Sequence, residues 1–506
     1  MKKIILCILI PVSVIGALSG QKKNKGAVEA LRDFEFCVAK VKADYPGYAD
    51  KHTPQLDLLE AGLRARVPLH PDSCLSYMQQ YMDYFNDNHL WVLYSKEYAE
   101  ELYEQEEEEE SEPIMVTLPE NVEKLNREGS IEGLWTLWYE RRFAIIPADK
   151  PGTYTGMWLE SGDGNGRYEK FCDFTHEADS LYSVTYPDSD YVGKATLELG
   201  GTVLDMHRTN IRLVHPSGDP AWDEAFIQAY VPSTQSGINI WEAYSSLDEN
   251  TFFIRISGFE YEECEEIEQA LEFNWEAITK RPNLIIDLRF NGGGSDYCWE
   301  KLHSLIYSSP YTSKGVEYYA TPGNIATIEK EITESADDGE VDEEYRQWRL
   351  TLLEGMKRNK GGWYTPEDYD ADGCWTREYD TVYTYPKRIG IIINHWCGSS
   401  TEQLLLEAKK SDKKVILFGN ENTTGTLDYS NVFVHEFPSG RYEAYIPMTR
   451  TLRPAEERID GKGIAPDIMV PFPENRRLDD KADLWVQFVK EYLNYLQEHE
   501  EGGEEE

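Results

Sequence analysis

Two adjacent serines, Ser399 and Ser400, stand where a predicted loop passes into a predicted helix. The isoleucine-rich run 389–393 indicates a buried strand before them, and a leucine-rich stretch indicates the helix after them. A serine at such a junction has its hydroxyl beside the free N–H groups of the helix start, which suits a nucleophile that generates an oxyanion. The pattern Ser399-x-x-Glu402 is also a capping box, and serine is a favoured N-cap for structural reasons alone. This stretch by itself leaves both interpretations open.

Two further polar turns contain residue types that could serve the same chemistry. Three glycines, Gly292, Gly293 and Gly294, directly follow the apolar run 284–288. Glycine lets backbone N–H groups approach a ligand closely, as an oxyanion hole requires, although such a run is more often only a tight turn. The other turn, IDGKGIAPD at residues 459–467, closes the last predicted strands.

His89 follows the turn Asn86-Asp87-Asn88 at the end of a predicted helix and precedes the apolar run LWVLY. A histidine in this place is able to point into a cleft, but a lone histidine is more often a packed or surface residue. Cys397 lies two residues before Ser399 and is a second candidate nucleophile. Packing in the core is the favoured interpretation of that cysteine.

The elements that must position these residues change in character along the chain. Residues 21–112 show apolar residues at helical spacing and end in an acidic run that is typical of a solvated linker. Residues 113–239 form short aromatic and β-branched runs separated by turn residues, which predicts an all-β module, either a barrel or a sandwich. No catalytic cluster is evident in that module, so packing or recognition is its favoured role.

From residue 240 to residue 475, strands alternate with helices. Strands are predicted at 252–257 and 284–288 with a helix at 261–280 between them, which indicates crossover units and a largely parallel α/β core. An acidic and aromatic insert at 310–386 separates these elements from the strand at 389, as a lid, a substrate wall or decoration. Residues 476–506 are predicted to form a helix and an acidic tail.

Composition narrows the classes of partner. The chain has 506 residues, of which 41% are hydrophobic and 12% aromatic, so it is able to bury a sizeable core. Its 92 acidic and 50 basic residues give a formal net charge of −42. Nucleic acid and anionic membranes would be repelled by this charge, so the sequence predicts neither as a partner. Oligomeric state is not indicated.

The N-terminus resembles an export signal. A basic start is followed by an apolar run and small residues, so residues 1–20 are predicted to be a cleaved signal peptide. A membrane anchor is the alternative, but the run is short and Pro11 interrupts it. No other segment could span a bilayer. The mature protein is therefore expected to be exported, to a periplasm or the extracellular space.

Cysteine usage does not indicate a disulfide framework. One of the 8 cysteines, Cys7, lies in the signal peptide, and the others are odd in number and scattered in spacing. No CxxC pattern indicates a metal site. One or two disulfides are compatible with an oxidising compartment.

In this order, the motifs resemble those of the C-terminal processing (tail-specific) and tricorn protease family. The resemblance rests on LIIDLRFNGGG, GSSTEQLLLEAKK and GKGIAPDI, and it covers roughly residues 240–470 with His89 as an outlying piece. It implies a serine protease core built as a crotonase-like ββα/βαβ spiral. It also implies that Ser399 is the nucleophile, and that the N–H of Ser400 and one N–H from the Gly292-Gly293 turn form the oxyanion hole.

The resemblance also predicts the general base. One branch of the family uses a lysine in a turn after the nucleophile helix, but the corresponding turn here, residues 422–428, has none. The tricorn-like branch uses a histidine in a D-x-H segment, and Asp87-Asn88-His89 fits that pattern. Asn88 stands where that branch has a hydroxyl residue.

The acidic member is predicted from the closing turn. Asp460 stands where the tricorn-like branch has a glutamate, and Glu402 is the alternative acidic partner. His89 would take the Ser399 proton and return it to the leaving amine, while Asp460 would orient and stabilise the imidazolium.

The sequence thus predicts a secreted serine endopeptidase that cleaves peptides or proteins through an acyl-enzyme on Ser399, without a metal or cofactor. Two alternatives remain: an inactive peptide-binding protein on the same fold, and a hydrolase of another amide or ester. The family often carries a PDZ module, but residues 133–231 lack an evident carboxylate-binding loop, so recognition of free C-termini is not implied.

Overall fold

The computed structural model describes most of the chain. Most of the predicted acidic linker (residues 107–112), the first eleven residues of the predicted signal peptide and the last residues of the acidic tail lie outside the described residues. The described residues are 12–106, 113–125, 130–137, 141–187, 189–198, 201, 203–206, 211–215, 244–338, 343–411, 414–470 and 484–501.

Contacts group the chain into two compact units that each combine distant segments. Unit 1 comprises Met1–Glu110, Val316–Pro366 and Tyr429–Arg450, and unit 2 comprises Ser111–Gly315, Glu367–Asp428 and Thr451–Glu506. The middle of the predicted insert therefore belongs to unit 1, whereas its two ends belong to unit 2. The linear domain boundaries expected from the sequence stay predictions.

The N-terminal part of unit 1 is helical, as predicted. Its helix α3 begins after Thr53, whose hydroxyl oxygen accepts a hydrogen bond from the Gln55 N–H at 3.2 Å, and Pro54 occupies the first position of the helix. The first helix, α1, runs through the expected signal cleavage site at residues 19–21. The helices are α1 (Val12–Asp44), α2 (Tyr48–Lys51), α3 (Pro54–Arg66), α4 (Cys74–Asp83) and α5 (Lys96–Glu106).

A mixed set of strands completes unit 1 and packs against these helices. Tyr442, Ala444 and Ile446 of β21 lie in one core cluster with Phe34 of α1 and Tyr81 of α4. The insert adds two helices, whose apolar residues pack with Met448. The strands are β1 (Trp91–Tyr94), β15 (Val316–Tyr319), β16 (Trp363–Tyr364), β20 (Tyr429–Glu436) and β21 (Tyr442–Thr451), and the helices are α9 (Pro322–Asp338) and α10 (Glu343–Arg358).

The β-rich module in unit 2 is a closed barrel, one of the two architectures expected. Strands β3 to β10 each pair with the next strand in antiparallel fashion, and β10 pairs back with β3. The interior is filled by large side chains such as Trp135, Phe143 and Phe174. The strands are β2 (Met115–Thr117), β3 (Gly133–Leu137), β4 (Arg141–Pro147), β5 (Thr153–Gly162), β6 (Arg167–Ala178), β7 (Leu181–Tyr186), β8 (Ser189–Glu198), β9 (Val203–Met206) and β10 (Ile211–Val214).

A second sheet of unit 2 holds the elements predicted for the α/β core. Its strand order is β11-β12-β13-β18-β19-β22, and all neighbours after β12 are parallel. Parallel strands need crossover connections, which explains the helices between them. The strands are β11 (Tyr244–Ser246), β12 (Thr251–Arg255), β13 (Asn283–Asp287), β18 (Arg388–Ile392), β19 (Val415–Gly419) and β22 (Ile468–Met469).

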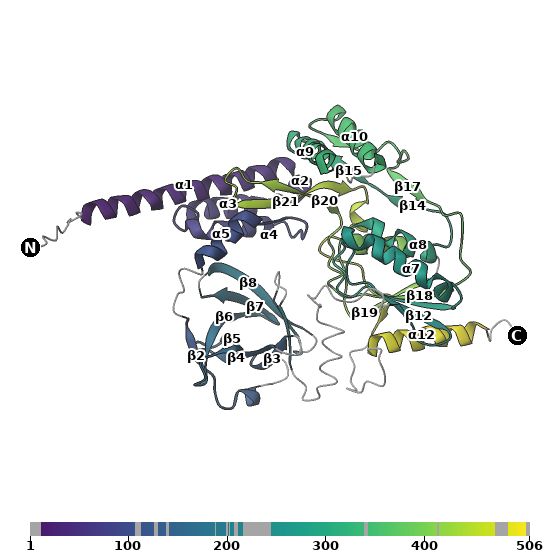
Figure 1. Cartoon of the computed structure of the whole chain (residues 1–506), viewed down its shortest axis with the longest axis horizontal. Coiled ribbons are helices and arrows are strands. Elements are labelled where there is room, and N and C mark those ends of the chain that lie inside the picture. Colours follow the sequence, from purple (N-terminus) through teal and green to yellow (C-terminus); the bar gives the residue numbers. More distant parts are fainter. Residues whose placement is uncertain are drawn as a thin grey trace, which may run out of the picture. The chain divides into compact units, whose positions relative to one another are not determined.

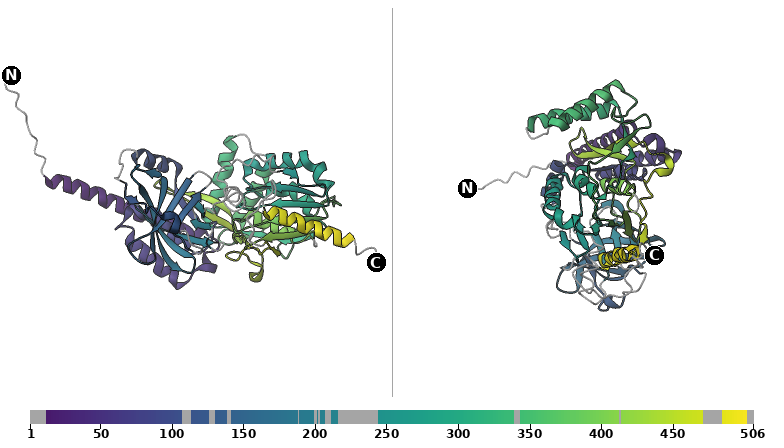
Figure 2. Two further views of the ribbon diagram at one scale, coloured as in Figure 1. Left: turned by 90° about the horizontal axis from the view of Figure 1, so that it is seen from below. Right: turned by 90° about the vertical axis from the view of Figure 1, so that its right-hand side faces the viewer.

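Helices cover both faces of this sheet (Figure 1). Ile286 of β13 packs in the cluster that includes α7, α8 and α11, whereas its neighbour Ile285 packs with α12 on the other face. Figure 2 shows α12, in yellow, from two further directions. The helices are α7 (Cys264–Thr279), α8 (Glu300–Ile306), α11 (Ser400–Ala408) and α12 (Leu484–Glu501). The spiral arrangement implied by the family resemblance stays a prediction.

The ends of the insert are tied to helix α11. They pair as the two-stranded sheet β14 (Tyr311–Lys314) and β17 (Cys374–Arg377). The Tyr311 hydroxyl donates to Glu407 of α11 at 2.7 Å, and the Arg377 guanidinium lies 3.3 Å from the same buried carboxylate. This network gives the base of the insert a fixed position on the helix that begins at the two serines.

Candidate active site

The glycine turn and the two predicted serines of unit 2 lie at the carboxyl ends of two parallel neighbours, β13 and β18. Asp287 and Ile392 are paired at these ends, and the glycine turn and the serine loop follow them directly. Asp287 is fully buried between Arg255 and Arg289, with oxygen to nitrogen distances of 2.6 Å to both guanidinium groups. Burial raises the pKa of Asp287, but the two arginines lower it by more, so the carboxylate stays charged and fixes the strand end.

Ser399 has a backbone conformation that a simple helix cap does not need. Its φ is 53° and its ψ is −122°, a left-handed region that residues other than glycine rarely adopt. The Thr401 N–H donates to the Gly398 carbonyl at 3.0 Å, which closes a tight turn around the two serines. The Ser399 side chain makes no cap hydrogen bond to the helix. Strain of this kind costs about 1–3 kcal/mol and is concentrated at functional sites.

Glu402 completes only the other half of the predicted capping box. Its buried carboxylate accepts hydrogen bonds from the Gly425 N–H at 2.7 Å, from the Thr426 N–H at 2.8 Å and from the Thr423 hydroxyl at 2.5 Å. The backbone N–H of Ser399 is a further donor to it. Burial raises the pKa of Glu402, and these hydrogen bonds offset part of that rise. Glu402 thus fastens the helix start to the loop 423–426.

Asn291 joins the glycine turn to the serine loop. Its side-chain oxygen accepts from the Gly293 N–H at 3.0 Å and from the Thr401 hydroxyl at 2.7 Å, and its side-chain nitrogen donates to the Ile256 carbonyl at 3.1 Å. The Asn291 carbonyl also accepts from the Gly398 N–H at 3.2 Å. The sequence pattern presented this residue only as the start of a turn, and the hydrogen bonds of its carboxamide were missed.

The two predicted halves of the oxyanion hole lie next to each other. A Cβ atom at Gly293 would stand 2.7 Å from the Ser399 Cβ and 2.8 Å from the Ser400 nitrogen. The Gly293 N–H is already donated to Asn291, so it is the less suitable of the two glycine donors. Within the described part of the chain, the N–H groups of Gly292 and Ser400 donate no hydrogen bond. These two groups are the better candidates.

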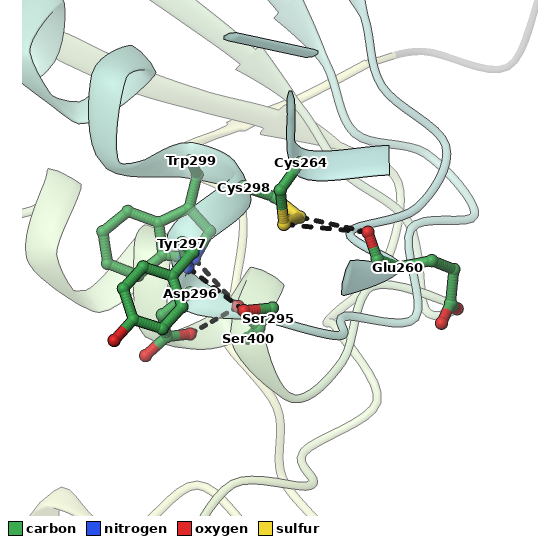
Figure 3. The surroundings of a disulfide bond; sticks show 8 residues. All are labelled: Glu260, Cys264, Ser295, Asp296, Tyr297, Cys298, Trp299 and Ser400. Atoms are coloured by element: carbon green, nitrogen blue, oxygen red, sulfur yellow. Dashed lines mark hydrogen bonds between the residues drawn. A yellow bond between two sulfur atoms is a disulfide. The ribbon is translucent and has the colours of Figure 1, made fainter. Parts of the chain in front are cut away.

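The hydroxyl of Ser400 is held by groups that sequence reasoning missed. It accepts a hydrogen bond from the Trp299 indole at 2.8 Å and donates one to the Asp296 carboxylate. Both partners follow the glycine turn, and a disulfide joins Cys298 beside them to Cys264 (Figure 3). The sequence offered no signal for these contacts, because a disulfide pairing and an indole partner both depend on tertiary structure.

Asp460 holds the backbone of the loop that leads into β20. One of its oxygens accepts from the N–H groups of Leu427 and Asp428 at 2.8 and 2.7 Å. In return, the Asp428 carboxylate accepts from the N–H groups of Ile459 and Asp460 at 2.8 and 2.7 Å. This reciprocal pair fastens the closing turn to the segment that immediately precedes Tyr429.

His89 is buried in unit 1 and is oriented by two hydrogen bonds. Its backbone N–H donates to the Asp87 carboxylate at 2.9 Å, and its Nδ1 lies 2.6 Å from the carbonyl oxygen of Tyr429. Since a carbonyl only accepts, Nδ1 carries the proton, and the lone pair of the neutral ring lies on Nε2. The pairing of His89 with Ser399, which belongs to unit 2, stays a prediction.

Cys397 does not have the properties of a nucleophile. It is fully buried, its thiol donates to the Leu288 carbonyl at 3.0 Å, and burial raises its thiol pKa well above the ordinary value. The packing interpretation agrees with this environment.

A comparison with known families decides the relationship of this segment. The model of peptidase family S41 matches residues 250–470. Residues 250–470 therefore belong to peptidase family S41. The matched S41 segment contains Gly292, Ser399, Ser400 and Asp460, whereas His89 lies outside it. At the level of the family, membership supports a serine-type peptidase.

Solved structures with a similar trace include proteases, at low sequence identity. Mature CPAF has a TM-score of 0.47 at 14% identity, over 93% of this chain and 96% of that chain. The photosystem II D1 C-terminal processing protease has a TM-score of 0.34 at 13% identity, over 88% of this chain and 93% of that chain. A putative S41 protease from Bacteroides fragilis has a TM-score of 0.30 at 10% identity, over 76% of this chain and 86% of that chain. No curated protein matches the sequence.

Two features are absent from the described residues. None of the helices described is long and apolar enough to cross a membrane. Over the same residues, no group of three or more histidine, cysteine, aspartate or glutamate side chains is arranged to hold a metal ion.

Proposed function

We propose that this S41 family member is an exported serine endopeptidase that forms an acyl-enzyme on Ser399. The observation that carries the proposal is the strained Ser399 turn, with φ at 53° and no side-chain cap bond, packed directly against Gly293. This conformation would not strengthen a capping hydrogen bond. It does expose a nucleophile to substrate when the nucleophile lies on a sharp turn between a strand and a helix.

The reaction begins with attack of the Ser399 hydroxyl on the scissile carbonyl. His89 takes the proton on Nε2, because its Nδ1 proton is held by the Tyr429 carbonyl. The negative charge that develops on the carbonyl oxygen is stabilised by the N–H groups of Gly292 and Ser400. His89 then protonates the leaving amine, and water hydrolyses the acyl-enzyme by the same route in reverse.

The acidic residue Asp460 is proposed to act on His89 indirectly. Asp460 was expected to hold the imidazole directly, but the Nδ1 position is taken by the Tyr429 carbonyl. Asp460 fastens residues 427 and 428, so its contribution to the histidine passes through the backbone that ends at Tyr429. Glu402 is not retained in this role, because its carboxylate is occupied by the helix start and the loop 423–426.

Export to a periplasm or the extracellular space is supported by the N-terminal sequence pattern and by the Cys264–Cys298 disulfide, since such bonds persist in oxidising compartments. Substrates are proposed to be peptides or proteins. Expression with an intact N-terminus, followed by mass determination of the secreted protein, tests the predicted cleavage near residue 20.

The decisive experiment is labelling by a fluorophosphonate, with Ser399→Ala as the comparison. We expect the wild type to be labelled on Ser399 and to cleave a peptide library, and the variant to do neither. Because the side chain makes no cap bond, the free energy of unfolding should change by less than about 1 kcal/mol.

Other outcomes would favour the rival functions. A wild type that binds peptides but is neither labelled nor active would be an inactive binding protein. Labelling with ester turnover and no peptide cleavage would indicate another hydrolase. Unfolding of Ser399→Ala would support a purely structural role for the serine.

A further inference from the structure

The Ser400 hydroxyl is fixed more firmly than the proposed mechanism requires. Ser400 and Trp299 are buried, and the indole N–H donates to the Ser400 Oγ at 2.8 Å. The same hydroxyl donates to one carboxylate oxygen of Asp296. Because the hydroxyl accepts one hydrogen bond and donates another, it cannot rotate freely. The fixed side chain in turn holds the peptide group that carries the Ser400 N–H.

The segment that carries Asp296 is anchored independently of helix α11. The disulfide between Cys264 and Cys298 fastens it to the start of α7 (Figure 3). A short parallel bridge between Phe259 and Gly294 continues this attachment, with the Ser295 N–H donating to the Phe259 carbonyl at 2.7 Å. Asp296 can therefore act as a fixed reference point for Ser400.

Charges of both signs surround the Asp296 carboxylate. Desolvation by burial is the largest effect and raises the pKa of Asp296 to about 6, although the hydrogen bond from Ser400 lowers it. Glu407 on α11 raises this pKa further, and Arg377 on β17 lowers it. Part of the Asp296 surface remains open to solvent. Proton exchange with solvent is therefore expected to be fast.

We propose that Asp296 is a positioning residue for the peptidase reaction, which fixes the Ser400 N–H beside the nucleophile by accepting the hydrogen bond of the Ser400 hydroxyl. This inference rests on the proposed function. An ionised carboxylate is the stronger acceptor for a hydroxyl, and a neutral carboxylic acid the weaker one. Positioning should therefore weaken when Asp296 is protonated, in addition to any loss caused by protonation of the general base.

The test measures kcat and KM from pH 5 to pH 9 on a peptide substrate selected with the wild type. Asp296→Asn retains an acceptor without the charge, Asp296→Ala removes the acceptor, and Ser400→Ala removes the donor. Glu266→Gln, which removes an exposed charge on α7, is the matched control and should match the wild type. Melting temperatures and fluorophosphonate labelling rates are recorded for each variant.

We expect kcat to fall by about 100-fold in Asp296→Ala with KM changed less than about twofold, because a small misplacement of a catalytic group has that cost. Asp296→Asn should lose less than about tenfold. The double variant Asp296→Ala with Ser400→Ala should be no slower than Ser400→Ala alone. As the pH falls through about 6, kcat/KM of the wild type should lose up to about tenfold more than that of Asp296→Asn, which cannot be protonated there.

The proposal is overturned if folded Asp296→Ala keeps the wild-type kcat, if the Asp296 and Ser400 effects multiply, or if the wild type and Asp296→Asn fall by the same factor on the acid side. The isosteric Asp296→Asn keeps the pH test decisive should the alanine variant fail to fold. A wild type without labelling on Ser399 would overturn the proposed function, and this inference with it. Normal wild-type labelling with an unaltered rate in Asp296→Ala would overturn this inference alone.

Discussion

Substitution of Gly293 by alanine tests the proposed geometry most directly. The added Cβ would lie 2.7 Å from both the Gly398 carbonyl oxygen and the Ser399 Cβ, and 2.8 Å from the Ser400 nitrogen. Ordinary contact begins at 3.4 Å, so the serine turn would have to retreat by about 0.7 Å. Gly293 also has a φ of 103°, which is costly for an alanine.

These two effects predict the size of the loss. Overpacking costs roughly 1–3 kcal/mol, and the backbone conformation adds roughly 1–2 kcal/mol. We therefore expect the free energy of unfolding to fall by about 2–5 kcal/mol. Because a displacement near 1 Å at a catalytic group costs about 100-fold in rate, we expect kcat to fall by between about 10-fold and 100-fold.

The assay compares Gly293→Ala with Gly292→Ala. A Cβ at Gly292 would meet no atom within 4 Å, and its φ is not in the left-handed region, so this variant should lose much less stability and keep its N–H group. Urea unfolding, peptide turnover and the fluorophosphonate labelling rate are measured for both. A folded Gly293→Ala with wild-type turnover, or equal damage in the two variants, would refute the close packing of the glycine turn on the serine turn.

Two further predictions concern the segment beside that turn. Replacement of both Cys264 and Cys298 by alanine should lower the free energy of unfolding by about 4 kcal/mol in the chain-entropy model, given the sequence separation of 34, as checked by denaturant titration with and without reductant. The raised pKa of Asp296 favours its protonated form in the folded state, so its contribution to stability is fully present below its unfolded pKa and is lost as the pH rises through about 6. Asp296→Asn should therefore gain melting temperature relative to the wild type between pH 4 and pH 7, and a constant difference over that range would contradict the assigned pKa shift.

The elements that carry the site were predictable from local pattern. Isoleucine runs marked β13 and β18, because strands buried on both faces are continuously apolar. The helix after Ser399 was also expected where it lies. The barrel was predicted only as one of two architectures, since closure depends on the pairing of β10 with β3 across the whole module.

The residues that hold the site residues by hydrogen bonds could not be predicted in the same way. Trp299, Asp296 and Tyr429 gain their roles from contacts with residues more than a hundred positions away, and nothing in their neighbourhoods in the sequence marks them. The hydrogen bonds of Asp460 could not be predicted for the same reason. Its carboxylate could be placed in a turn, but its partners depend on how that turn packs.

The sequence by itself determined which residues could supply chemistry here, because residue type and local spacing decide whether a hydroxyl lies at a helix start and whether glycines follow a strand. Tertiary structure alone decided how those groups are held. Three features arise where segments from different crossover units meet. They are the strained Ser399 turn, the hydrogen bond from the Gly293 N–H to Asn291, and the hydrogen bond from the Trp299 indole to the Ser400 hydroxyl. Backbone strain and hydrogen-bond partners depend on contacts between these segments, since each requires atoms that the local sequence does not contain.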